Sequence, residues 1–330
     1  MEIPNIFFYI ILIFLNLITL KLIFSLSKKY QLYDLPNERK LHTQPISYLG
    51  GFLFFLSNFA YLLYYKTFIF ESHFLIYNLS HIFSLIFISS FIFLTGLLDD
   101  KVDLSPLKKT IILIILISSS VMIDGDLLIS KIKFNFFEQE LYLKNFSFFF
   151  TILCIYIFIN ASNMFDGADL QLGLYFFVII TYLYFKSNYL NIFAPLIIPL
   201  IVFLIANFKN ICFMGNNGSH FLSYILSIFI IKFYNLGILN TVEEVVIIML
   251  IPGLDLIRLF VNRVLNNKKF FESDLNHIHH ILIKSKNKYV VQLIILIFNI
   301  SPIVVAEVVG SYLIGIIFGI ISYFFLLRKV

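Results

Sequence analysis

The chain has 330 residues, of which 60% are hydrophobic and only 13% are charged. This composition excludes a soluble globular protein, because a water-exposed surface needs more charge than the sequence supplies. Apolar runs of about 20 residues, the length that crosses a bilayer, recur along the whole sequence, and no soluble insertion of domain size interrupts them. We therefore predict an all-α polytopic membrane protein in which residues 1–330 form one integral-membrane domain.

The apolar runs predict about eleven transmembrane helices. They begin near residues 3, 48, 79, 110, 146, 170, 189, 221, 242, 289 and 309. The first run follows Glu2 rather than a basic stretch and precedes no small-residue cleavage site. We expect it to be a retained membrane helix rather than a signal peptide.

The distribution of Lys and Arg predicts the orientation. If the N-terminus is outside, the cytoplasmic segments hold 17 of the 24 basic residues. These segments are 27–47, 99–109, 207–219, 258–288 and 328–330. Because basic loops stay in the cytoplasm, the N-terminus is expected outside and the C-terminus inside. The net charge of +5 then reflects orientation, and we expect no nucleic-acid partner. Residues 127–145, on the outside, alternate in polarity and predict a small periplasmic β-hairpin.

Three aspartates follow the third span, in the sequence LLDDKVD. Asp99 and Asp103 are i,i+4 neighbours if the helix continues for a turn, so their carboxylates would share a face with Asp100 beside them. A solvated helix end is the simpler interpretation of an isolated pair of acids. Crowded carboxylates acquire a function when a proton or a cation is shared, because the pKa of one is then raised or a metal offsets the repulsion.

Asn160, Asn163, Asp166 and Asp169 recur at i+3 spacing from the end of the fifth span into a turn at Gly167. Adjacent members of this series can face one another on a helix. A polar side chain inside the membrane requires a partner and is a functional candidate by default. A capped helix end accounts for one Asn and one Asp but not for four polar residues.

Two further cytoplasmic segments carry candidate ligand-binding groups. The sequence FMGNNGS, residues 213–219, contains glycines that let backbone amides approach an anion. His277, His279 and His280 stand in a loop rich in lysine. This loop contains neither a cysteine nor a His-Glu-x-x-His pattern, which argues against zinc, and histidines among lysines favour a phosphate ligand. The lysines alone also fit a loop that lies on anionic lipid headgroups.

Taken in order, four segments resemble the polyprenyl-phosphate N-acetylhexosamine-1-phosphate transferase family, glycosyltransferase family 4, which includes the phospho-MurNAc-pentapeptide translocase. Residues 34–51, with an Asp-x-Pro, an Arg-Lys-x-His and a Gly-Gly, look like the family's first loop. Residues 96–109 and 160–169 resemble its two aspartate signatures. Residues 276–282, NHIHHIL, resemble its histidine motif and are most similar to the bacterial undecaprenyl-phosphate GlcNAc-1-phosphate transferase branch.

The resemblance implies a reaction. A polyprenyl phosphate, undecaprenyl phosphate in bacteria, would attack the β-phosphorus of a UDP-N-acetylhexosamine such as UDP-GlcNAc and release UMP, with Mg²⁺ or Mn²⁺ as cofactor. The enzyme would lie in the bacterial inner membrane with its site facing the cytoplasm, and it would initiate a cell-envelope polysaccharide such as the O-antigen of lipopolysaccharide. A homodimer is compatible with this family. Both substrates are anionic, so a cation is needed before they can be brought together.

The resemblance also assigns residues. Asp99 and Asp100 would be the catalytic acidic pair, which places the lipid phosphate, binds the metal or accepts a proton. The metal ligands would be Asp99, Asp100 and Asn216. The substrate-binding residues would be Lys109, Asn163, Asp166, Asp169, Phe213, His277, His279 and His280. By this resemblance Lys109 and the three histidines would contact phosphate, and Phe213 would stack on uracil.

Three positions depart from the family pattern. Asn216 stands where the family has an aspartate that binds magnesium, Leu170 and Gln171 replace a Gly-Leu pair, and Leu275 replaces an arginine. An uncharged amide oxygen is the poorer magnesium ligand. Two alternatives to an active transferase follow. One is a family member that binds lipid phosphate or nucleotide sugar without turnover, and the other is an unrelated transporter with acids near the bilayer midplane.

Overall fold

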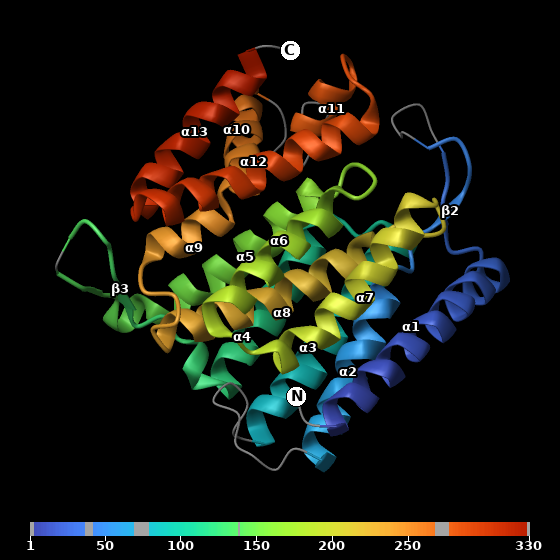
Figure 1. Ribbon diagram of the computed structural model, residues 1–330. Coiled ribbons are helices and arrows are strands. Elements are labelled where there is room, and N and C mark those ends of the chain that lie inside the picture. Colours follow the sequence, from blue (N-terminus) through green and yellow to red (C-terminus); the bar gives the residue numbers. More distant parts are fainter. Residues whose placement is uncertain (1–2, 37–41, 69–78, 138, 268–276, 329–330) are drawn as a thin grey trace.

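The computed structural model describes residues 3–36, 42–68, 79–137, 139–267 and 277–328 (Figure 1). Within these ranges the chain is almost entirely helical. The first eight helices are α1 (Ile3–Tyr30), α2 (Gly51–Phe68), α3 (Leu79–Val102), α4 (Pro106–Ile123), α5 (Ser147–Phe165), α6 (Gln171–Ser187), α7 (Leu190–Phe208) and α8 (Gly215–Asn235). The others are α9 (Val242–Ile248), α10 (Leu250–Leu265), α11 (Ile278–Ile283), α12 (Lys288–Val309) and α13 (Tyr312–Arg328). The all-α prediction is confirmed.

Each of the eleven predicted spans coincides with helical structure. Among the described residues, α1, α4, α5, α7 and α12 are long and apolar enough to cross a membrane by length and composition. The ninth span was predicted as one helix but is two, α9 and α10. Pro252 has no N–H to donate to the Ile248 carbonyl, so the helix breaks at Met249. The short helix α11 was not predicted, because six residues carry too little periodicity.

Helix α8 is the centre of the bundle. Every residue from Asn217 to Phe233 is buried, and most of these side chains are apolar or small, as a helix surrounded by others needs. It packs most extensively against α3 and also against α2 and α5. Helices α10 to α13 form a layer on one side of this bundle (Figure 1).

Two short β-hairpins flank the helices. The predicted outside hairpin is present, with β3 (Lys131–Ile132) antiparallel to β4 (Leu141–Tyr142). A second hairpin, β1 (Tyr33–Asp34) with β2 (Ile46–Ser47), was not predicted, because its paired residues lie twelve or more positions apart in the chain.

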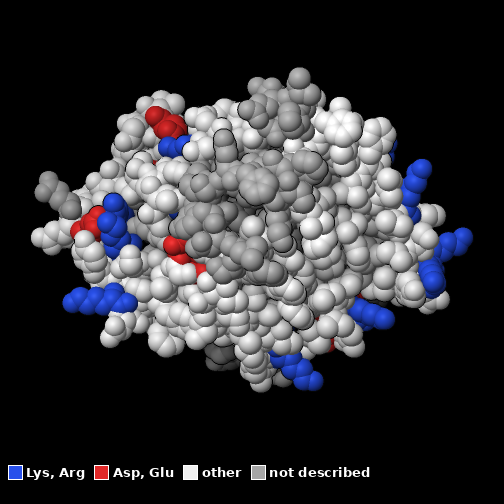
Figure 2. Space-filling view, turned by 90° about the horizontal axis from the view of Figure 1, so that it is seen from below, with Lys and Arg blue, Asp and Glu red and all other residues white. Residues whose placement is uncertain are grey.

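The surface matches lipid as a solvent. In the space-filling view from below, uncharged residues cover most of the described surface, and the few Lys and Arg residues lie near its margins (Figure 2). Many fully apolar side chains are exposed, including Phe7, Phe14 and Phe24 on α1. In water such a surface would be an aggregation liability, whereas in a bilayer it is the expected contact with acyl chains.

Candidate functional site

A cavity of about 340 Å³ lies at one end of the bundle, where α3 and α5 end and where α6 and α8 begin. Seven of the eleven predicted site residues line it. They are Asp100, Asn163, Asp166, Asp169, Phe213, Asn216 and His280. The other four, Asp99, Lys109, His277 and His279, are not among its described lining residues.

Asp100 is held by the start of α8. The N–H groups of Asn216 and Asn217 donate to its two carboxylate oxygens at 2.9 and 3.1 Å, and the Asn217 side chain donates at 2.7 Å. A helix N-terminus favours a negative charge at this place. The glycine-containing turn before α8 was predicted to present amides to an anion, and the anion that these two amides contact is the protein's own Asp100.

A glycine allows this contact. A Cβ atom on Gly96 would lie 2.4 Å from the Asn216 carbonyl oxygen, closer than nonbonded atoms can approach. Without a side chain at this position, α3 lies directly against the first turn of α8 about two turns before its own C-terminal end. The two adjacent aspartates of α3 therefore meet α8 from different sides.

Asp99 belongs to a separate hydrogen-bonded network behind the cavity wall. Lys109 Nζ and the Asn216 amide nitrogen lie 2.8 and 2.9 Å from Asp99 Oδ2. The Asn216 oxygen accepts from the Asn163 amide at 2.6 Å, and that amide also donates to Ser219. Lys109, Asp99, Asn216 and Asn163 thus form a continuous chain in which each polar group has a partner.

Asp103 does not join the pair as the i,i+4 spacing suggested. Helix α3 ends at Val102, and Asp103 takes a left-handed conformation with φ +51° while its N–H donates to the Asp99 carbonyl. Its side chain is exposed. Asn160 also lies apart from the described cavity lining, since its side chain donates to the Tyr156 carbonyl within α5.

The acids that face the cavity repel one another. Burial raises the pKa of the Asp166 carboxyl to about 7, and the nearby charges of Asp100 and Asp169 add to this shift. Burial also raises the pKa of Asp100 to about 6, although the donors from α8 oppose the change. Both carboxylates are costly to ionise in one cavity, and a bound cation would lower that cost. Such an arrangement is typical of a cation site.

The donor groups on the cavity wall fit a magnesium ion. Magnesium is bound by oxygen ligands, commonly one or two carboxylates together with substrate phosphates and water. Asp100 and Asp166 supply two carboxylates that face the cavity. The Asn216 oxygen also lies at the wall but accepts from Asn163. Asp99 fits less well, because it is not among the described lining residues of the cavity and its charge is already paired with Lys109.

Asp169 closes the side of the cavity next to α12. Its Oδ2 accepts from Lys288 Nζ at 3.0 Å. Lys288 is the first residue of α12, and it had been noted only as one of several loop lysines. This ion pair connects the turn after α5 to the C-terminal layer of helices.

Leu170 occupies a backbone conformation that suits glycine. Its φ of +68° lies in the left-handed region, where an L-residue costs about 1–2 kcal/mol. Its N–H donates to the Asn207 side chain, which fixes the turn. The departure from the family's glycine at this position therefore introduces backbone strain beside the cavity.

We expect the Leu170→Gly variant to be more stable than Leu170→Ala by about 1 kcal/mol, because both lose the side chain but only glycine adopts this φ without cost. The control pair is Leu183→Gly and Leu183→Ala in the interior of α6, where alanine should be the more stable by about 0.5–1 kcal/mol. Thermal unfolding in detergent measures both differences. If the stability difference between the glycine and alanine variants had the same sign at positions 170 and 183, backbone strain at Leu170 would be contradicted.

The three histidine rings lie against one another, with His277 stacked on His279, and we call this group the histidine stack. The His279 ring lies 5.4 Å from His277 and 4.2 Å from His280, measured between centroids. His279 is only 1% exposed, and burial lowers its pKa well below the usual histidine value. It therefore lies inside the protein as a neutral ring, and of the three only His280 is among the described cavity-lining residues.

Asp255 of α10 holds the histidine stack and was missed from the sequence. Its Oδ2 lies 3.2 Å from His277 Nδ1, and its Oδ1 accepts from Arg258 and Tyr323 at 2.8 Å each. The available signal was Asp255 inside the ninth predicted span, with Arg258 three residues on at the start of the predicted cytoplasmic segment, because an acid inside a span is a functional candidate by default.

The first loop lies beside Phe213. The N–H of Phe213 donates to the Ser47 carbonyl at 2.7 Å, and the Gly50 N–H donates to the Phe213 carbonyl at 2.9 Å. The ring of His42 meets Phe213 edge to face at 5.1 Å, and His42 Nε2 lies 3.0 Å from Asp34 Oδ2. The basic residues of this loop, Arg39 and Lys40, lie outside the described residues, as do Lys268, Lys269, Leu275 and Asn276 in the histidine loop.

A second cavity, of about 510 Å³, is almost wholly apolar and extends between α5, α8, α9, α10 and α13. Its lining includes Phe150 and Phe158 of α5 and Ile257 of α10. Ile257 is 58% exposed at the rim. The cavity reaches Leu254 of α10, next to the Asp255 that holds His277. An apolar cavity thus ends close to the histidine stack.

Comparison with known proteins gives consistent matches. A family model described as "Glycosyl transferase family 4" matches residues 82–234. The chain is 27% identical over 315 residues to the "Probable undecaprenyl-phosphate N-acetylglucosaminyl 1-phosphate transferase" of Bacillus subtilis, covering 90% of this chain and 84% of the relative. It is also 27% identical over 282 residues to the "Undecaprenyl-phosphate alpha-N-acetylglucosaminyl 1-phosphate transferase" of Escherichia coli K12, covering 81% and 74%.

Proposed function

Because the chain belongs to glycosyl transferase family 4, we propose that it transfers a sugar 1-phosphate from a UDP-sugar to a polyprenyl phosphate and releases UMP. The relatives' names favour N-acetylglucosamine 1-phosphate as the transferred group and undecaprenyl phosphate as the acceptor. The product would initiate a cell-envelope polysaccharide. The distribution of lysine and arginine favours a site that faces the cytoplasm from the bacterial inner membrane.

The observation that carries this proposal is the acid-lined cavity. Its described lining includes Asp34, Asp100, Asp166 and Asp169 but no Lys or Arg. A diphosphate that enters alone would meet the ionised acids of this lining with no lysine or arginine among the described lining residues to offset them. A cavity of this kind suits a nucleotide diphosphate that arrives with a divalent cation. A transporter with acids at the bilayer midplane accounts less well for acids gathered at one end of the helices.

The apolar cavity supports a lipid acceptor. Its lining is provided by side chains such as Ile155, Ile230 and Leu250, which offer no hydrogen bond to a nucleotide and suit a polyprenyl chain. In the proposed reaction a lipid phosphate oxygen forms a bond to the β-phosphorus, and the bond from that phosphorus to the oxygen bridging to the α-phosphate breaks. UMP leaves with that oxygen.

We propose Asp100 and Asp166 as the residues that hold magnesium, with manganese as an alternative ion. The bound ion would offset the negative charge of the diphosphate. Asp99 would hold the side chains of Lys109 and Asn216 in position through its hydrogen bonds. Lys109 would offer its ammonium group to a phosphate. Phe213 would stack on the uracil, Asn163 and Asp169 would line the nucleotide site, and His280, supported by His277 and His279, would contact the diphosphate.

The test is UMP release by the purified protein in lipid, with undecaprenyl phosphate and Mg²⁺ or Mn²⁺. A panel of UDP-GlcNAc, UDP-GalNAc and other UDP-sugars identifies the donor. UMP release that requires both substrates and the metal would support the transferase. Binding of UDP-sugar without any UMP release across the panel would instead favour a non-catalytic family member, the alternative that Asn216 suggests.

We expect Asn216→Asp to strengthen metal dependence. The new carboxylate would replace an amide that donates to Asp99 at 2.9 Å, so two carboxylates would face each other beside the single positive charge of Lys109. The variant should melt at a lower temperature than the native protein without Mg²⁺ and recover when Mg²⁺ is added. Half-maximal UMP release should need about 10-fold less Mg²⁺, because metal affinity rises with the charge of the ligands.

The control for added charge is Asn210→Asp, an exposed position in the segment between α7 and α8, which should leave the Mg²⁺ dependence unchanged. If Asn216→Asp shows the native Mg²⁺ requirement and the native melting temperature, position 216 does not contribute to the metal site.

A further inference from the structure

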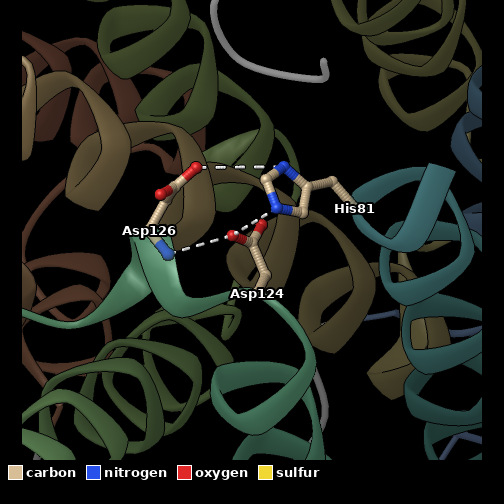
Figure 3. Close-up of side chains that lie close together, drawn as sticks. All are labelled: His81, Asp124 and Asp126. Atoms are coloured by element: carbon tan, nitrogen blue, oxygen red, sulfur yellow. Dashed lines mark hydrogen bonds and ion pairs between the residues drawn. The ribbon is translucent and has the colours of Figure 1, made fainter. Parts of the chain in front are cut away.

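A second polar cluster lies at the opposite end of α3 from the acid-lined cavity. His81 is in the first turn of α3, Asp124 directly follows α4, and Asp126 lies in the 3₁₀ helix η1 (Gly125–Leu127) (Figure 3). Eighteen residues of α3 separate His81 from Asp99, a rise of about 27 Å. That distance is close to the thickness of the bilayer core, about 30 Å. The cluster therefore cannot take part in the transfer reaction.

The three side chains point toward one another from separate elements (Figure 3). His81 Nε2 lies 3.4 Å from Asp124 Oδ1, and His81 Nδ1 lies 3.9 Å from Asp126 Oδ2. One nitrogen or oxygen atom from each residue lies within 4.8 Å of the others. The His81 and Asp124 side chains are 6% and 3% exposed, so the cluster is largely shielded from water.

These separations fit a bound ion better than direct hydrogen bonds. A hydrogen bond between a nitrogen and an oxygen is usually about 2.9–3.0 Å long. Two ligand atoms that each lie about 2.1 Å from a tetrahedral zinc ion are about 3.4 Å apart, which is the distance from His81 Nε2 to Asp124 Oδ1. Asp126 faces the other ring nitrogen, and its 44% exposed side chain has room to turn toward the same ion.

The charges of the cluster favour a cation. Lys232 Nζ contacts Asp124 Oδ2 at 2.7 Å, and both side chains are 3% exposed. This buried pair is neutral overall, and Asp124 Oδ1, which accepts from the Asp126 N–H at 3.2 Å, lies on the side of His81. The charge of Asp126 then makes the group of four residues negative when His81 is neutral. A divalent ion would offset that charge. It would also lie between the lone pairs of the Asp124 carboxylate and the His81 imidazole, which face each other.

The site has an entry from solvent. A polar cavity of about 390 Å³ is lined by Asp126 and Lys232 together with Lys131, Tyr234 and Asn235. An ion can reach Asp126 through this cavity, and water in it can supply a fourth ligand. The imidazole ligand favours zinc or a similar transition metal over magnesium or calcium, which prefer ligand sets made of oxygen.

We propose that His81, Asp124 and Asp126 bind one zinc-class divalent ion at the membrane face opposite the acid-lined cavity. Lys232 holds the Asp124 side chain in position through its contact with Oδ2. The ion connects the start of α3, the end of α4 and the outer hairpin segment, so its binding should raise the stability of that end of the bundle.

The test is zinc binding by the full-length purified protein in detergent, measured by calorimetry and metal analysis with excess Mg²⁺ present. The native protein should bind one equivalent of Zn²⁺ more than His81→Ala. The matched control is His280→Ala in the other histidine cluster, which should retain that equivalent. Because zinc can also bind His277, His279 and His280, the difference between these two variants is the decisive quantity.

Asp126→Asn provides a second variant in case His81→Ala does not fold, since its side chain is partly exposed and tolerant of change. It should weaken zinc binding by about 10-fold or more and should remove most of the rise in melting temperature that zinc gives the native protein. Equal zinc stoichiometry and affinity in the native protein, His81→Ala and Asp126→Asn would overturn the proposal. None of these measurements depends on UMP release, so their outcome is separate from that of the proposed transferase activity.

Discussion

Replacing Asp100 with Asn is expected to lower UMP release by about 1000-fold. The carboxylate receives three donors from the start of α8 and faces the cavity, where it would hold the metal that offsets the charge of the diphosphate. Asparagine removes the charge and turns an NH₂ group toward amides that can only donate. Loss of one electrostatic group in a preorganised site typically costs 10²–10³-fold in rate, and loss of a metal ligand adds to that cost.

Asp103→Asn is the matched control, because it makes the same chemical change three residues away at an exposed position. Asparagine tolerates the left-handed φ of this residue as well as aspartate does. Steady-state UMP release, together with melting temperatures for both variants, separates catalysis from folding. Native activity in Asp100→Asn, or an equal loss in Asp103→Asn, would mean that Asp100 has no special role.

Gly167→Ala is expected to reduce kcat/KM for the UDP-sugar by about 100-fold and to lower the melting temperature. A Cβ atom at this position would lie 2.0 Å from the His279 ring. That ring is buried and lies against both His277 and His280, so moving it also displaces these two rings. Displacement of the histidine stack by about 1 Å is enough to cost about 100-fold in rate.

A second substitution tests the cause. In the Gly167→Ala/His279→Ala double variant the clash is removed, so the melting temperature should recover toward that of His279→Ala while the rate remains low. Gly125→Ala is the control, since a Cβ atom there meets nothing within 4 Å. If the stability lost by the double variant equals the sum of the losses in Gly167→Ala and His279→Ala, then Gly167 and His279 do not interact.

The fold was largely predictable, because the hydropathy of a segment indicates whether lipid or water surrounds the helix that it forms. Runs near the length of a bilayer crossing predicted helices at the observed positions, and the alternation in residues 127–145 predicted the outer hairpin. The break between α9 and α10 was not predicted, although Pro252 was a visible signal. The hairpin of β1 and β2 depends on pairing between residues twelve or more apart, which a local pattern does not contain.

The candidate site was predictable in its residues but not in their orientations. Sequence spacing indicated that Asp99, Asp100 and Asp103 would act together, whereas the structure divides them between a network, the cavity and the surface. That division depends on how closely α3 approaches α8, which Gly96 permits. Whether a carboxylate faces a cavity or a lysine is decided by packing between helices, and no single-helix pattern records it.

Asp255 is a residue whose role was not predicted from the sequence. It lies in an amphipathic helix, so its position alone did not distinguish a buried ligand of His277 from a solvated residue. Its partners come from α10, from the histidine loop and from Tyr323 of α13. Contacts between segments this far apart in the chain become visible only in three dimensions.

The hydrogen bond from Tyr323 to Asp255 also bears on how the protein is made. Tyr323 is 0% exposed and lies five residues before Arg328, the last residue of α13. A chain emerging from the ribosome therefore completes the support of its histidines only after the final helix has entered the membrane. Nascent chains that stall before that step would lack the Tyr323 hydrogen bond, so Asp255 would hold His277 with one donor fewer.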